Sequence, residues 1–265
     1  MGPANFLTEA LSFIFTAANW SGPAGLGARI LEHLQYTFVA LVFSVLIAVP
    51  LGMVIGHTGR GTFLVVTGVN ALRALPTLGV LLLGVLLWGL GLVPPTVALM
   101  LLGIPPLLAG TYSGIANVDR NVVDAARSMG MTESRILLRV ETPNAMPLIL
   151  GGLRTSTLQI VATATVAAYA SLGGLGRYLI DGIKIREFYL ALVGALMVTL
   201  LALILDALLA LAVWASVPGS GRLPRGKSRM PQPLLSDEVA LESRSINSTS
   251  GPGYERGRSS PTVEQ

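Results

Sequence analysis

Long uncharged runs decide what this 265-residue chain can fold into. Several stretches of 18 or more residues contain no Asp, Glu, Lys or Arg, and such runs are typical of helices that cross a lipid bilayer. The charges are also unevenly placed: 20 of the first 216 residues are charged, against 12 of the last 49. The sequence therefore predicts an all-α integral membrane body followed by a polar tail, and it excludes a water-soluble enzyme.

About five transmembrane helices are predicted, near residues 30–56, 62–92, 93–116, 147–172 and 188–217. Pro76 predicts a kink in the second span, and the uncharged turn at 89–95 makes a helical hairpin of the second and third spans. The apolar patch at 6–18 is too short to cross about 30 Å of hydrocarbon. We therefore expect residues 1–28 to form an interfacial or extracytoplasmic segment, with a sixth span as the alternative.

Basic residues predict the orientation, because Lys and Arg that flank short loops are retained in the cytoplasm. With the N-terminus outside, eleven of them lie in or beside cytoplasmic regions and four lie outside: Arg60, Arg73, Arg120, Arg127, Arg135, Arg139, Arg154, Arg222, Arg225, Lys227 and Arg229, against Arg29, Arg177, Lys184 and Arg186. The loop at 117–146 and the tail at 218–265 are therefore predicted to be cytoplasmic. The tail is rich in Ser, Gly, Pro and Arg without periodicity, so we expect it to be disordered. Topology also explains the net charge of +4, so no nucleic-acid partner is expected.

No catalytic or metal site is predicted in this chain. It has no cysteine, and its two histidines, His33 and His57, lie about one membrane span apart. Both are near the ends of predicted spans, so we expect them at the membrane interfaces. The segment GRLPRGKS at 221–228 matches the phosphate-binding pattern of nucleotide-binding loops, but that loop works only between a buried strand and a helix. A membrane helix precedes it here, so we expect no nucleotide to bind.

The loop at 117–146 carries helix signals without being a span. Asp119 is predicted to cap a first helix, and Gly130 suits the left-handed position that ends it. Thr132 is predicted to cap a second helix, which Pro143 then ends. Such a helix–glycine–helix elbow suits the docking of another protein, although an ordinary amphipathic connector has the same periodicity.

Each helix of this elbow has a predicted apolar side. In the first helix we expect Val122, Ala126 and Met129 to share one face. The second presents an apolar side and, at a spacing of four residues, a basic pair: Ile136, Leu137 and Val140, with Arg135 and Arg139.

The segment DAARSMGMTESRILLRVETP at 124–143 resembles the EAA motif of binding-protein-dependent ABC importer permeases of type I. In that motif an acidic-Ala-Ala triplet is followed by Gly and, about a dozen residues later, by Pro; here these are Asp124, Ala125, Ala126, Gly130 and Pro143. Three positions depart from the family pattern, since Asp124 replaces the usual Glu, Val140 an Ile and Thr142 a Leu. The resemblance extends over about residues 30–217.

Five flanking segments look like the branch of the family that imports quaternary-amine osmoprotectants such as glycine betaine, choline and proline. They are EHLQYTFVALVFSVLIAVPLG at 32–52, RALPTLGVLLLG at 73–84, PPLLAGTYSGI at 105–115, GLRTSTLQIVATATVAAYASLGGLGRYL at 152–179 and LILDALLAL at 203–211.

The resemblance implies an inner-membrane importer with two permease subunits, identical or homologous, two cytoplasmic ATPase subunits and an extracytoplasmic solute-binding protein. ATP would be bound by the separate ATPase, so this chain needs no cofactor. The elbow at 119–142 would act as the lever between ATPase and spans. Asp124 is then a candidate ion-pair partner of the ATPase, and Met129 and Met131 are candidate apolar contacts.

Other polar and aromatic residues in the spans have either a pathway or a packing role: Tyr36, Tyr112, Thr163, Tyr169 and Asp206. Aromatic faces recognise quaternary ammonium groups, but Tyr and Trp also favour membrane interfaces. For Asp206 and Arg154 we favour a structural role, through pairing or access to the interface.

Two alternatives remain at this point. The same architecture could import another solute, such as methionine or another amino acid. An autonomous channel or secondary transporter would instead conduct without an ATPase and would depend on an intramembrane charge such as Asp206.

Overall fold

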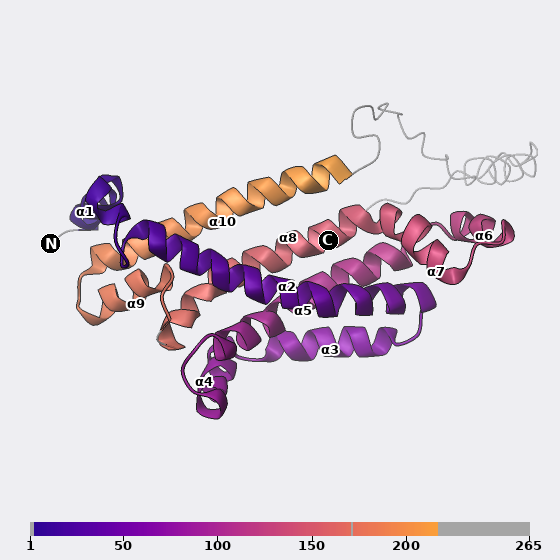
Figure 1. Ribbon diagram of the computed structural model, residues 1–265, viewed down its shortest axis with the longest axis horizontal. Helices are drawn as coiled ribbons and strands as arrows, with labels where there is room; N and C mark the ends of the chain where they lie inside the picture. The colour runs from indigo at the N-terminus through magenta and orange to yellow at the C-terminus, as the bar shows by residue number, and fades with distance from the viewer. Residues whose placement is uncertain (1–2, 171, 217–265) are drawn as a thin grey trace, which may run out of the picture. The chain divides into compact units, whose positions relative to one another are not determined.

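The computed structural model describes residues 3–170 and 172–216, and all regular elements in these ranges are helical (Figure 1). The predicted disordered tail and the GRLPRGKS segment lie outside the described residues. In chain order the elements are α1 Pro3–Phe15, η1 Ala17–Trp20, α2 Leu26–Thr58, α3 Thr62–Ala74, α4 Thr77–Trp88, α5 Val93–Ala116, α6 Arg120–Ser128, α7 Glu133–Ile136, η2 Leu137–Glu141, α8 Thr142–Thr163, η3 Ala164–Ala170, α9 Gly176–Lys184 and α10 Phe188–Ser216.

Helix α5 forms the centre of the bundle, where it packs against both α2 and α8. The contacts are close because glycines stand at the crossings. A Cβ atom added at Gly52 of α2 would lie 2.7 Å from the Cβ of Thr111 in α5, and one added at Gly110 of α5 would lie 2.8 Å from the Cα of Gly152 in α8. Small residues at such positions let helix backbones approach each other in a membrane.

Buried hydroxyl and imidazole groups add hydrogen bonds between these helices. Ser156 Oγ of α8 donates to the carbonyl of Gly103 in α5 at 2.8 Å. His33 of α2 is fully buried, and its Nε2 lies 3.0 Å from the carbonyl of Val161 in α8. Helix α8 therefore covers His33, and the position of this residue at a membrane interface stays a prediction.

Three helices in the described part of the chain are long and apolar enough to cross a membrane: α2, α5 and α10. The pair α3 and α4 adds a fourth candidate if both helices belong to one broken span. Helix α8 occupies most of the fourth predicted span, but it carries Arg154 and several polar residues, and it gives way to η3 after Thr163. The number of helices that cross the bilayer remains a prediction.

The predicted kink at Pro76 is confirmed and is larger than a bend within one helix. The segments Thr67–Ala74 and Thr77–Trp88 meet at an angle of 78°. Leu75 is extended, with φ −71° and ψ 128°, because the ring of a following proline disfavours helical backbone in the residue before it. The second predicted span is thus two helices.

The N-terminal part contains a short apolar helix. Helix α1 has 13 residues and packs on α10, where the rings of Phe6 and Phe188 meet edge to face at 6.0 Å. Helix α2 already begins at Leu26, within the predicted N-terminal segment. The interfacial position of α1 remains a prediction.

We predict that Gly52→Ala destabilises the bundle, because the new methyl group forces α2 away from Thr111 or strains both helices. Overpacking of this kind costs about 1–3 kcal/mol. Unfolding of the detergent-solubilised chain in increasing dodecyl sulfate, followed by circular dichroism, measures the difference. Gly151→Ala in α8 is the matched control, since nothing lies within 4 Å of its added Cβ. Equal stability of the two variants would show that the α2–α5 crossing is not tight.

Candidate coupling site

The elbow between α5 and α8 has part of the predicted local structure. The side chain of Asp119 caps α6, with its Oδ1 accepting a hydrogen bond from the backbone N–H of Asn121 at 2.9 Å. Gly130 follows α6 in the left-handed region, with φ +81°. Thr132 stands at the N-cap of α7, but its side chain makes no capping hydrogen bond. The helix–glycine–helix pattern is therefore confirmed, with only one of the two side-chain caps formed.

The apolar face predicted for α6 is wrong. Val123 and Ala126 are buried, and they form a small core with Ile136 of α7, against which Met131 and Val140 also pack. Two members of the predicted face point outward instead: Val122 is 45% exposed and Met129 is 76% exposed. The reason is that α7 folds back over the side of α6 that carries positions 123 and 126, and periodicity alone does not show where the next helix lies.

Pro143 does not end the second helix of the elbow, so that prediction is also wrong. The chain passes from α7 through the π-helical turn η2 into α8, in which Pro143 is an early residue. In a regular α-helix the proline ring clashes with the carbonyl four residues earlier. The π turn loosens the helix here, and the backbone N–H of Thr142 reaches back five residues to the carbonyl of Leu137. Asn144 Nδ2 donates to the carbonyl of Val140 at 2.7 Å.

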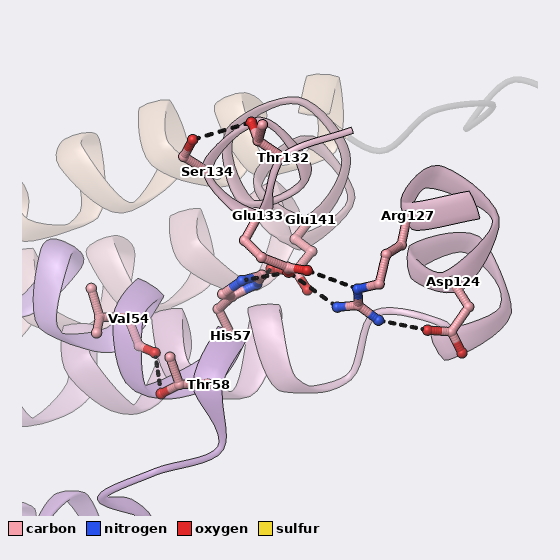
Figure 2. A network of polar contacts seen from close by, with 9 residues as sticks. All are labelled: Val54, His57, Thr58, Asp124, Arg127, Thr132, Glu133, Ser134 and Glu141. Carbon is pink, nitrogen blue, oxygen red and sulfur yellow. Dashed lines mark hydrogen bonds and ion pairs between the residues drawn. The ribbon is translucent and has the colours of Figure 1, made fainter. Parts of the chain in front are cut away.

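A network of polar contacts joins the elbow to the end of α2 (Figure 2). His57 Nδ1 lies 2.6 Å from Glu141 Oε2, and His57 Nε2 lies 3.2 Å from Glu133 Oε2. Arg127 then donates from Nε to Glu133 Oε1 at 2.7 Å and from Nη1 to Asp124 Oδ1 at 2.8 Å. The five side chains come from α2, α6, α7 and η2.

The members of this network differ in their access to solvent. The Glu141 side chain is 2% exposed and that of His57 is 13% exposed, whereas Glu133, Arg127 and Asp124 are open to solvent. A buried carboxylate is costly unless a cation or hydrogen-bond donor faces it, so His57 is a structural requirement of Glu141. His57 is therefore not a lone histidine, and its position at a membrane interface stays a prediction.

The contact between His57 and Glu141 was not predicted from the sequence. They are 84 residues apart, and no local pattern connects them. One signal was present: Glu141 follows Leu137 by four residues, so it is an acidic side chain on an otherwise apolar side of the elbow.

The predicted elbow residues divide by position. Asp124, Ala125, Met129 and Gly130 are exposed, Ala126 is buried, and Met131 is partly buried in the elbow core. Asp124, expected to pair with an ATPase, pairs with Arg127 within the elbow.

The predicted pathway residues are dispersed over several elements. Tyr36 is buried in α2, Tyr112 in α5 lies 3.5 Å from Thr62 Oγ1, and Tyr169 in η3 is exposed. Thr163 is the last residue of α8. Among the hydrogen bonds and ion pairs of residues 3–170 and 172–216, none joins any of these side chains to another.

The pairing expected for the two intramembrane charges is confirmed. Arg154 of α8 donates from Nε to Asp206 Oδ1 at 2.5 Å and from Nη2 to Asp206 Oδ2 at 2.7 Å. This bidentate geometry is the strong form of an Arg–carboxylate contact, and it links α8 to α10. In the described part of the chain, no group of three or more His, Cys, Asp or Glu residues is placed to hold a metal ion.

The sequence is similar to those of known transport proteins. The family described as "Binding-protein-dependent transport system inner membrane component" matches residues 48–213. The choline transport system permease protein OpuBB of Bacillus subtilis is 37% identical over 181 residues, which are 68% of this chain and 83% of the relative. The osmoprotectant import permease protein OsmY of Salmonella typhimurium is 35% identical over 68% of this chain and 77% of its own length.

Solved structures show the same fold. A permease-containing structure described as inward-facing conformations of the MetNI methionine ABC transporter superposes with a TM-score of 0.65 at 21% identity, covering 72% of this chain and 96% of that chain. The crystal structure of an amino acid ABC transporter with histidines gives a TM-score of 0.58 at 21% identity, covering 81% and 99%. At this identity the likeness concerns the fold.

The geometry of the network also predicts a titration. Arg127 donates a hydrogen bond to Glu133, and this contact lowers the pKa of that carboxyl; the charges of Arg127 and His57 act in the same direction. Because the folded-state pKa is depressed, the pair contributes stability above the ordinary Glu pKa and loses it as pH falls through the lowered value. We expect Arg127→Gln to raise the pKa of Glu133, measured by the carboxyl carbon shift of Glu133 in the detergent-solubilised chain. Arg135→Gln is the control and should leave that pKa unchanged; a Glu133 pKa insensitive to Arg127 would contradict the network.

Proposed function

The chain belongs to the family of binding-protein-dependent transport system inner membrane components, and from this membership we propose that it forms half of the translocation path of an ATP-driven osmoprotectant importer. The solute class is supported by the names of its relatives, which are permeases for choline, for glycine betaine, carnitine and choline, and for osmoprotectants. Their shared chemistry is a small solute, typified by choline and glycine betaine, that carries a quaternary ammonium group. No side chain of this permease is proposed to catalyse a reaction.

The partners proposed are those that such a transporter needs. A second permease subunit, identical or homologous, completes the path. A solute-binding protein delivers the solute at the extracytoplasmic end, and two ATPase subunits bind ATP at the cytoplasmic end. The distribution of basic residues supports an orientation with the elbow in the cytoplasm, because that orientation places eleven of the fifteen Lys and Arg residues in or near the spans and short loops on the cytoplasmic side.

The observation that carries the coupling proposal is the outward-facing surface of α6. Val122 and Met129 are exposed apolar side chains on a capped helix that stands at one end of the bundle (Figure 1). Exposed apolar side chains grouped on such a helix are typical of protein-binding sites, and Met adapts its shape to a partner. We assign the ATPase as the partner of this surface.

The structure supports a narrower role for Asp124 than direct pairing with the ATPase. Its Oδ1 is used by Arg127 inside the elbow, so we propose that Asp124 fixes the arginine. The exposed Ala125 beside it leaves room for a partner to approach α6 closely.

Transport then follows from two arrangements of packed helices. Closure of the ATPase subunits displaces the elbow, and because packed helices switch between discrete arrangements, the spans change which side of the membrane has access to the path. The Arg154–Asp206 pair keeps α8 and α10 together in this change, which is a structural role.

The test is uptake of radiolabelled glycine betaine and choline by proteoliposomes that hold the permease, its ATPase and its binding protein. We predict ATP-dependent uptake by the wild type and its loss in Gly130→Pro, because proline fixes φ near −65° where the elbow has +81°. Gly130→Asn is the matched control and should retain most uptake, since Asn tolerates left-handed backbone.

Each other outcome rejects a stated part of the proposal. Uptake without ATPase would identify a channel or secondary transporter. ATP hydrolysis stimulated by the loaded binding protein, with neither solute moved, would leave the architecture and reject the solute class in favour of another, such as an amino acid. Full uptake by Gly130→Pro would reject coupling through the elbow.

A further inference from the structure

His57 connects three segments that are remote in sequence. It is the penultimate residue of α2, and its ring lies between Glu133, the first residue of α7, and Glu141, the last residue of the π turn (Figure 2). Each ring nitrogen faces a different carboxylate. A single side chain of α2 therefore contacts both ends of the segment that links the elbow to α8.

We call the contact of His57 with Glu133 and Glu141 the joint. Its geometry depends on the two nitrogens of the imidazole ring. An imidazole ring has a nitrogen on each of two sides, so the single ring of His57 can contact both carboxylates at once. The contact to Glu141 is sheltered from water, with the Glu141 side chain 2% exposed. Electrostatic contacts weaken less by screening in such a place than at the open surface.

The contacts of His57 continue to helix α6 through Glu133 and Arg127. Arg127 of α6 holds both oxygens of Glu133, from Nε to Oε1 at 2.7 Å and from Nη2 to Oε2 at 3.0 Å. Direct side-chain contacts therefore connect α6 to Glu133 and Glu133 to the ring of His57.

The end of α2 that carries His57 has two features that bear on its movement, a proline and a closely packed glycine. Pro50 lies inside α2, seven residues before His57, and removes one backbone hydrogen bond, which is a common origin of helix bending. Between the two, Gly56 packs tightly on α5, where an added Cβ would lie 2.8 Å from the Cβ of Ile115. The last two turns of α2 can thus follow the elbow and carry α5 with them.

We propose that His57 is a positioning residue that transmits the displacement of the elbow to α2, so that ATP hydrolysis moves the spans. The proposal rests on the proposed coupling through the elbow. It identifies His57 as the residue through which movement of the elbow reaches α2. Loss of the joint leaves the ATPase attached and active while its motion no longer reaches α2.

The experiment compares solute imported per ATP hydrolysed in proteoliposomes of the complete transporter, with glycine betaine and choline as probes. We expect His57→Met to lower this ratio about tenfold, within the usual range of coupling energies, while binding-protein-stimulated hydrolysis stays within about twofold of wild type. His57→Lys restores a cation that can donate to both carboxylates, and we expect it to recover much of the ratio.

Two further variants separate transmission from folding. Glu141→Gln keeps the shape of the side chain and removes its charge, so it should lower the ratio even if His57→Met does not assemble. Arg60→Met removes a cation three residues after His57 that is exposed and makes no ion pair among the described residues; it should leave the ratio unchanged.

The outcomes distinguish this inference from the proposed function. An unchanged ratio in both His57→Met and Glu141→Gln, or uptake and hydrolysis that fall in parallel, would overturn the role of His57. If the wild type itself shows no uptake that depends on the ATPase, the proposed function fails first and the inference fails with it. If the wild type is coupled and both His57→Met and Glu141→Gln leave the ratio unchanged, only the inference is rejected.

Discussion

Close approach of helix backbones is the constraint on which the described body of this chain depends. In a bilayer the hydrophobic effect gives little preference for a neighbouring helix over lipid, so association relies on tight packing and on hydrogen bonds between helices. Glycines at the α2–α5 and α5–α8 crossings permit that packing, and Ser156 adds a hydrogen bond across one of them. A chain with larger residues at these crossings would keep its apolar helices and lose their arrangement.

The same packing places the elbow network. Gly56, which lies against Ile115 of α5, directly precedes His57. Because α5 leads into α6 and α8 begins where η2 ends, the helices that hold α2 also hold both carboxylates that His57 contacts. The packing of α2 against α5 therefore also determines the geometry of the elbow. The proposed coupling uses the contact of His57 with Glu133 and Glu141.

Local signals predicted the local structure of this protein well. Asp119 and Gly130 act through their own backbone neighbourhood, and their predicted roles are confirmed. Pro76 predicted a bend for the same reason, but its angle of 78° depends on what α3 and α4 pack against. The predicted fold class agrees with the helices observed and with the permease structures that share the fold.

The failures concern contacts between distant segments. The buried face of α6 contains Val123 where Val122 was expected, since the position of α7 decides it. Pro143 was expected to end a helix, but a π turn accommodates it. The pairing of His57 with Glu141 spans 84 residues and follows from the α2–α5 packing, which no single-sequence periodicity contains.

Cross-linking can measure directly whether the elbow binds the ATPase. The chain has no cysteine, so Met129→Cys provides one site for a benzophenone label in the complete transporter. We expect that light joins this site to the ATPase, with a yield that changes when ATP binds. The same label at Ile183→Cys, an exposed site on α9, should give no such product. Adducts with the ATPase from position 183, and none from position 129, would show that the elbow does not bind the ATPase.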